Sequence, residues 1–353
     1  PEGVEVNGTL QWISGNKLAF LAEQNALEKI YVVDHHQESS IVLTPEAQVV
    51  GNYDITPDGS IASIRSGLTS ATDLFFNEDR VHEANPQIAR WKLPKLSLET
   101  WIGAEGDEVQ GILELPPDHE PGKPLPLIVA IHGGPTASSK FCYRYWIYHR
   151  TLMPAKGYAV LLPNYRGSTG YGDEFMTDLI GRENDIEVED ILTGVDAMIE
   201  RGIADPERLG VSGWSNGGYL TNCLIATNRF KAASSGAGVF DMTIQWAEED
   251  TPGHVINYME GLPWEKPAAY QKASPLYAFK PGIKTATLIH VGENDARTPA
   301  THSRSLHRAL HYYIDAPCEL LVHKNEGHGL RSYRHRLAKM TVSYTHLTLP
   351  TRS

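Results

Sequence analysis

The sequence predicts an α/β fold, a mostly parallel sheet with helices on both faces, preceded by a partial β-propeller. Two observations carry this prediction. From residue 125 onward, short apolar runs such as LIVAI (127–131) alternate with segments of helical spacing. Near-continuous apolar strands separated by helices are typical of a parallel sheet covered on both faces. Earlier in the chain, residues 10–23 and 53–66 share one pattern of short strands and turns, 43 residues apart.

The repeated pattern predicts about two propeller blades within residues 1–90. Each copy is followed by another strand, KIYVVD (29–34) or DLFFNE (73–78). A repeat of about 40–45 residues fits one blade, and an ordinary antiparallel sheet with chance self-similarity is the alternative. Two blades are too few to close a ring, and the chain begins with proline rather than methionine. We therefore expect a fragment of a longer protein.

Residues 91–341 are expected to form the α/β domain. Its first element is a hairpin over residues 99–117, and a later helix over 189–203 has one apolar face and Gly202 at its C-cap. The last twelve residues, VSYTHLTLPTRS (342–353), depart from the basic helical segment before them. They resemble a translated sequencing adapter, so we expect residues 342–353 to be a non-native read-through tail.

The composition excludes several classes of protein. The 353 residues are 41% hydrophobic and 21% charged, with a net charge of −12. An acidic chain without a basic stripe is a poor candidate for binding nucleic acid or an anionic membrane. No apolar run approaches the roughly 18 residues of a membrane span. The three cysteines form neither a CxxC motif nor a plausible disulfide framework.

The stretch RLGVSGWSNGGYL (208–220) predicts a reactive serine. Gly213, Gly217 and Gly218 surround Ser215, between a short apolar strand and a segment of helical spacing. A strand, a glycine-flanked turn carrying serine, and a helix together make a nucleophile elbow, G-x-S-x-G. A glycine-rich turn whose serine only caps the helix is the alternative.

Two further strand ends supply the partners that a serine nucleophile needs. Asp295 follows TLIHVGEN, and His328 follows ELLVHKNEG. A serine hydroxyl needs an imidazole to accept its proton, and the imidazole needs a carboxylate to fix its tautomer. The chain order Ser215, Asp295, His328 is that of the α/β-hydrolases, which is therefore the predicted fold class.

The segment HGGP (132–135) predicts an oxyanion hole. It follows the strand LIVAI directly, and its glycines let the backbone approach a reacting carbonyl closely. The backbone N–H groups of Gly134 and Asn216, the residue after the nucleophile, are the expected donors. A plain Gly-Pro turn is the alternative.

Five motifs in order, HGGP, PNYRGSTGYG, GWSNGG, GENDARTP and EGHG, resemble the prolyl oligopeptidase family of serine peptidases. The most similar branch is that of the acylaminoacyl peptidases and bacterial dipeptidyl aminopeptidases, and the resemblance covers roughly residues 95–341. It implies a β-propeller joined to a C-terminal α/β-hydrolase domain. It also implies Ser215 as nucleophile, Asp295 as orienting acid, His328 as base, and Gly134 and Asn216 as oxyanion donors.

The resemblance further implies that Arg297, two residues after the acid, binds a substrate carbonyl; a surface ion pair is the alternative. Two departures stand out, because Asn216 replaces a common tyrosine and His323-Lys324 replaces a common Tyr-Pro pair. No cofactor or metal is expected. His307 and His311 have the i, i+4 spacing of metal ligands, but no HExxH motif or third ligand accompanies them. An exposed helix face is therefore the favoured interpretation.

The sequence thus predicts a serine peptidase that hydrolyses short peptides through an acyl-enzyme, by acylaminoacyl or dipeptidyl release. A carboxylesterase acting on small acyl esters is the alternative, and a non-catalytic propeller binding module is a distant one. The substrate preference, homo-oligomer formation and a cytoplasmic or periplasmic location stay open at this point.

Overall fold

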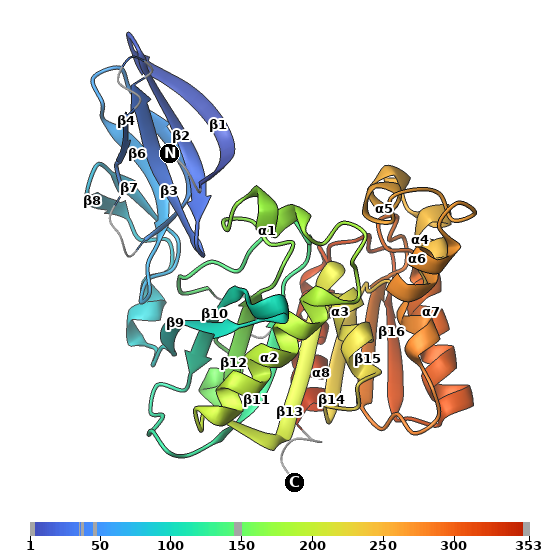
Figure 1. Cartoon of the computed structure of the whole chain (residues 1–353). Helices are drawn as coiled ribbons and strands as arrows, with labels where there is room; N and C mark the ends of the chain where they lie inside the picture. Colours follow the sequence, from blue (N-terminus) through green and yellow to red (C-terminus); the bar gives the residue numbers. More distant parts are fainter. Residues whose placement is uncertain (1–3, 35, 37–38, 45–47, 145–149, 349–353) are drawn as a thin grey trace.

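The structure, a computed structural model, describes residues 4–34, 36, 39–44, 48–144 and 150–348. Three sheets make up these residues. Two four-stranded antiparallel sheets come first in the chain, and one eight-stranded sheet follows. Figure 1 shows the two small sheets together beyond one end of the large sheet.

The two small sheets have the same up-and-down order of strands. The first contains β1 (Glu5–Ser14), β2 (Lys17–Gln24), β3 (Leu27–Asp34) and β4 (Ser39–Val42). The second contains β5 (Val49–Ile55), β6 (Ile61–Ser66), β7 (Asp73–Phe76) and β8 (Asp79–His82). Leu21 and Ile30 of the first sheet pack with Val50 and Tyr53 of the second in one apolar cluster. Sheets of four strands packed face to face are the arrangement of neighbouring propeller blades.

The large sheet has the strand order β16-β15-β14-β13-β11-β12-β10-β9. Its strands are β9 (Lys95–Ile102), β10 (Glu108–Leu115), β11 (Leu125–Ile131), β12 (Ala159–Asn164), β13 (Ala204–Trp214), β14 (Ala232–Gly236), β15 (Ala286–Gly292) and β16 (Cys318–His323). The six neighbouring strands β12, β11, β13, β14, β15 and β16 all pair in parallel, whereas β10 runs antiparallel to both of its neighbours. The predicted hairpin is β9–β10.

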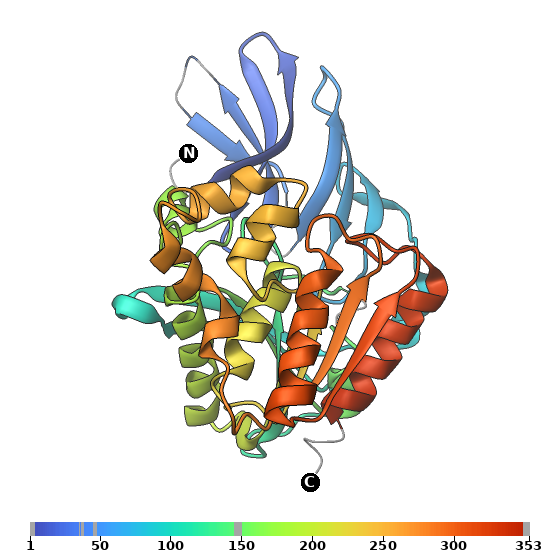
Figure 2. The ribbon, with the colours of Figure 1, turned by 90° about the vertical axis from the view of Figure 1, so that its right-hand side faces the viewer.

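Helices cover both faces of the large sheet (Figures 1 and 2). The helices are α1 (Asp173–Thr177), α2 (Ile186–Glu200), α3 (Asn216–Ile225), α4 (Met242–Glu248), α5 (Pro252–Tyr258), α6 (Pro267–Ala273), α7 (Ala300–Arg308) and α8 (Tyr333–Thr348). Apolar residues of α2, α3 and α7 share one core cluster with one face of the sheet. The opposite face packs with Met153, Tyr158 and Leu347, the last of which belongs to α8. Carboxyl ends of parallel strands meet at one edge of such a sheet, where chemistry gathers.

The predicted division at residues 90 and 91 falls between a 3₁₀ turn (Pro86–Arg90) and β9. Residues 342–348 continue helix α8, and 349–353 lie outside the described residues. The domain limits and the origin of the tail stay predictions. Within the described ranges, no helix combines the length and the apolar composition that a membrane crossing requires.

Candidate active site

Ser215 stands in a sharp turn between β13 and α3. Its backbone has φ 61° and ψ −123°, in a region that residues other than glycine rarely adopt. A Cβ at Gly213 would lie 2.1 Å from the Gly217 carbonyl oxygen, and one at Gly217 would lie 2.2 Å from the Ile131 carbonyl oxygen. Only glycine fits such distances, which explains the glycines around the serine. The predicted strand, turn and helix are all present.

The structure brings Ser215, His328 and Asp295 into one hydrogen-bonded chain. His328 Nε2 lies 2.9 Å from Ser215 Oγ, and His328 Nδ1 lies 2.9 and 3.0 Å from the two oxygens of Asp295. The Asp295 side chain is fully buried, whereas the His328 side chain is 32% exposed. Such an arrangement lets the imidazole accept the serine proton while the carboxylate holds its other nitrogen.

Asp295 is fixed by the turn that follows β15. Its Oδ1 accepts hydrogen bonds from the backbone N–H groups of Arg297, at 3.0 Å, and Thr298, at 2.9 Å. The buried carboxylate therefore has donors besides the imidazole, which a buried charge requires. The turn itself is tied to the His328 loop, because the Asn294 N–H donates to the Glu326 carbonyl oxygen at 2.8 Å.

The loop that carries His328 is held by two residues that sequence reasoning missed. The Glu326 carboxylate accepts hydrogen bonds from the backbone N–H groups of Arg331 and Ser332 and from His335 Nδ1, at 2.7–2.9 Å. The Arg331 N–H foremost, together with these other donors, lowers the pKa of Glu326 to about 2. The Trp214 indole N–H donates to the His328 carbonyl oxygen at 2.9 Å. Trp214, the residue before Ser215, thus holds the loop that carries His328.

The HGGP segment lies against the elbow. A Cβ at Gly133 would lie 3.2 Å from Ser215 Cβ, and Gly134 has φ +130°. Asn216 is the first residue of α3, so its backbone N–H has no partner within the helix. Tyr165 joins the two segments, because its hydroxyl donates to the His132 carbonyl oxygen and accepts from Asn216 Nδ2, each at 3.0 Å. The oxyanion-donor roles of Gly134 and Asn216 stay predictions.

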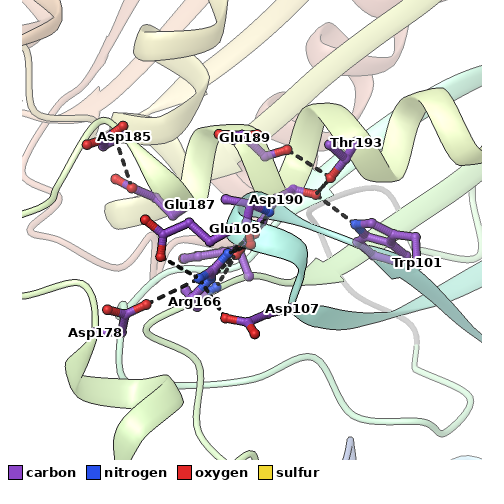
Figure 3. Close-up of polar contacts among 12 residues, drawn as sticks. Trp101, Glu105, Asp107, Arg166, Asp178, Asp185, Glu187, Glu189, Asp190 and Thr193 are labelled. Carbon is purple, nitrogen blue, oxygen red and sulfur yellow. Dashed lines mark hydrogen bonds and ion pairs between the residues drawn. The ribbon is translucent and has the colours of Figure 1, made fainter.

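Arg166 anchors the loop that carries Tyr165 (Figure 3). Its side chain is 1% exposed and contacts the buried carboxylate of Asp190, on α2, through Nε and Nη2 at 3.1 and 2.9 Å. Its Nη1 donates to Asp107 at 3.1 Å and to Asp178 at 3.2 Å. Asp190 also accepts from the Ala104 backbone N–H at 2.9 Å. This cluster ties the β9–β10 connection, α2 and the loop after β12 together.

A cavity of about 290 Å³ opens beside Ser215. The ends of β11 and β13 and the segment 138–144 provide most of its lining, including Trp214 and Lys140, and Leu162 of β12 adds to it. Lys140 forms an ion pair with Glu23 of β2 at 2.5 Å, and Glu23 also accepts from Thr169 at 2.6 Å. The first small sheet therefore holds the loops that border the cavity.

Arg297 lies at the surface near the site. Its Nε donates to Asp250 at 2.6 Å, and both side chains are 47% exposed. Its backbone carbonyl oxygen accepts from Gln245 at 2.8 Å. The surface ion pair considered from the sequence is therefore present, and carbonyl binding by the same guanidinium stays a prediction.

Residues 145–347 match the model of the prolyl oligopeptidase family. The chain is 35% identical over 223 residues to the acylamino-acid-releasing enzyme of Arabidopsis thaliana, covering 60% of this chain and 28% of that protein. It is 31% identical over 309 residues to the uncharacterized peptidase YuxL of Bacillus subtilis, covering 82% of this chain and 45% of that protein.

Among solved structures, the uncomplexed acylaminoacyl peptidase of Pyrococcus horikoshii has a TM-score of 0.88 at 23% identity. The match covers 100% of this chain and 57% of that one. The fold is therefore an α/β-hydrolase preceded by part of a β-propeller, which confirms the predicted fold class. The chain belongs to the prolyl oligopeptidase family, as its motifs indicated. It spans less than half of the length of the two curated relatives.

Proposed function

We propose that the protein is a serine peptidase that hydrolyses short peptides through an acyl-enzyme on Ser215. The observation that carries the proposal is the position of His328, within 3.0 Å of both Ser215 Oγ and the buried Asp295. Family membership supports a peptide substrate. The names of the relatives, acylamino-acid-releasing enzymes and dipeptidyl peptidases, support the release of an acylated amino acid or a dipeptide from the N-terminus of that peptide.

In the proposed acylation step, Ser215 Oγ attacks the scissile carbonyl carbon while its proton passes to His328 Nε2. Asp295 accepts the Nδ1–H bond, which fixes the tautomer and stabilises the imidazolium. The backbone N–H groups of Asn216 and Gly134 are proposed to donate to the oxyanion, each worth about 2.7–4 kcal/mol. The C–N bond then breaks as His328 returns the proton to the leaving amine.

Deacylation repeats these proton transfers with water as the nucleophile. His328 accepts a proton from the water, whose oxygen attacks the acyl carbon, and the ester bond to Ser215 breaks as the proton returns to Oγ. The cavity of about 290 Å³ beside Ser215 is of a size to take one or two substrate side chains.

A fluorophosphonate probe tests the nucleophile. We expect labelling at Ser215, loss of labelling in Ser215→Ala, and a fall in turnover of about 10⁴–10⁶-fold in that variant. Ser212→Ala is the matched control, because Ser212 is a buried serine of β13 that lies three residues before Ser215. Labelling of another serine, or activity retained in Ser215→Ala, would contradict the proposal.

Chromogenic substrates of three kinds separate the modes of release. An N-acetylated aminoacyl anilide, a dipeptidyl anilide with a free amine and an internally cleaved peptide are compared at equal concentration with a short acyl ester. We expect one of the first two to give the highest kcat/KM. Hydrolysis of the ester alone would favour the carboxylesterase.

A further inference from the structure

The strongest cluster of metal-ligating side chains outside the active site joins α7 to β16. Among the described residues, His307, His311 and Cys318 place one ligand atom each within 4.8 Å of the others. His307 lies on α7, His311 on the π-helical segment Ala309–Ile314 that continues it, and Cys318 is the first residue of β16. We propose that these three side chains bind a zinc ion.

The donor set favours zinc over other common cations. Imidazole nitrogen and thiolate sulfur are ligands that Zn²⁺ prefers, whereas Mg²⁺ and Ca²⁺ prefer oxygen. Tetrahedral zinc, with bonds of about 2.0–2.3 Å, needs ligand atoms roughly 3.3–3.7 Å apart. The three ligand atoms lie within 4.8 Å of one another, so the proposal requires side-chain rotations that bring them to this spacing when the ion binds. Three protein ligands leave the fourth position for water.

The backbone holds all three ligands on regular elements. The rings of His307 and His311 stack with centroids 5.1 Å apart and planes 15° from parallel. Asp315, with φ 60° and ψ 38°, then reverses the chain. The Ala316 N–H donates to the Leu310 carbonyl oxygen at 3.0 Å, which closes the reversal. This reversal brings the end of the helix and the start of the strand together. Figure 2 shows α7 lying along β15 and β16 at this edge of the sheet.

Cys318 faces the helix rather than the opposite side of the sheet. It packs with the same apolar cluster as Leu306 and Leu310, and its Sγ–H donates to the His307 carbonyl oxygen at 3.9 Å. Its neighbour Glu319 points the other way, where it meets His346 of α8 at 3.3 Å. On binding, the thiol proton leaves to solvent and the thiolate bonds to Zn²⁺.

The proposed zinc site lies far from the reacting atoms. Five residues of β16 follow Cys318 before the His328 loop begins, and at about 3.3 Å per residue they span roughly 17 Å. Zinc here would cross-link α7 and β16 without touching Ser215. We therefore expect metal to change stability and to leave hydrolysis unchanged, so the proposal stands or falls independently of the proposed function.

Cobalt titration tests the site, because Co²⁺ replaces zinc and reports its ligands by absorbance. We expect one Co²⁺ per chain, intense tetrahedral d–d bands and a thiolate-to-cobalt charge-transfer band, all removed by adding Zn²⁺. Cys318→Ser should abolish the charge-transfer band. His311→Ala should weaken binding at least tenfold, and because His311 is exposed, this variant keeps the fold. His82→Ala, an exposed histidine of β8, is the matched control and should change neither quantity.

Thermal unfolding gives a second readout. Free Zn²⁺ at about one hundred times its Kd should raise the unfolding midpoint by roughly 5–10 °C, and the shift should vanish in Cys318→Ser. Cobalt bound without a charge-transfer band overturns the proposal. So does a band that survives Cys318→Ser, or an affinity that His82→Ala lowers as much as His311→Ala does.

Discussion

Replacing Arg297 by alanine should impair peptide hydrolysis more than ester hydrolysis. Arg297 has five N–H donors, and in the described residues only its Nε is engaged, by Asp250. The two terminal nitrogens are therefore available to the backbone carbonyl of a peptide that extends past Asp295. A short acyl ester has no carbonyl at that position. The backbone N–H of residue 297, which holds Asp295, is kept in the alanine variant.

The structure sets the size of the two effects. The ion pair between Arg297 and Asp250 joins side chains that are each 47% exposed, so its loss costs about 0–1 kcal/mol of stability. A charged hydrogen bond to a substrate carbonyl is worth about 1.5–3 kcal/mol, or roughly 10–150-fold in kcat/KM for peptides. Ester hydrolysis should change by no more than about threefold, because the three proposed catalytic residues are untouched.

The measurement is the ratio of the peptide loss to the ester loss in the same protein preparation. Asp250→Asn is the matched control, because it removes the ion pair and leaves the guanidinium in place. We expect this variant to change peptide kcat/KM by no more than about threefold. Equal losses for peptide and ester in Arg297→Ala, or a loss in Asp250→Asn as large as that in Arg297→Ala, would refute substrate binding by Arg297.

Four further predictions concern the surroundings of the site. Tyr165→Phe leaves the His132 carbonyl oxygen and the Asn216 amide without their shared partner, so kcat should fall roughly 5–100-fold in steady-state assays. Arg166→Met leaves Asp190 buried without its cation and should lower the unfolding free energy by about 3–5 kcal/mol in urea titration. Glu326→Gln weakens the acceptor of Arg331 and Ser332 and should lower the thermal midpoint by roughly 3–10 °C. Burial foremost, with the carboxylates of Glu187 and Glu249, raises the pKa of Glu183 to about 8. The folded state therefore favours the neutral acid, and the stability of the protein should fall as the pH rises from about 4.5 to 8. Glu183→Gln should flatten this pH dependence in thermal scans at several pH values.

The sequence indicated the fold class and the residues at the strand ends because both depend on local patterns. The glycines around Ser215 indicate a turn that few other residues can make. Apolar strands that alternate with helices predict a parallel sheet. Carboxyl ends of parallel strands converge, so Asp295 and His328 were expected near the serine. Their catalytic roles stay predictions, although the side chains lie within hydrogen-bond distance.

The supporting contacts were not accessible from the sequence, because their partners lie far apart in the chain. Arg166 meets Asp190, 24 residues away, and Trp214 meets the His328 carbonyl oxygen, 114 residues away. No periodicity encodes such pairs. Cys318 was overlooked beside His307 for a related reason, because the π-helical segment and the reversal at Asp315 are needed to bring them together.

The tight glycine packing around Ser215 has a consequence for protein engineering. A side chain at Gly213, Gly217 or Gly218 would overlap main-chain atoms at 2.1–2.2 Å, and those atoms belong to three different segments of the molecule. Randomised libraries that include these codons would consist mostly of dead clones, however mild the substitution. Diversity aimed at a new substrate range belongs instead at exposed positions such as Arg297 and Asp250. There a changed side chain meets solvent, and the screened population keeps its fold.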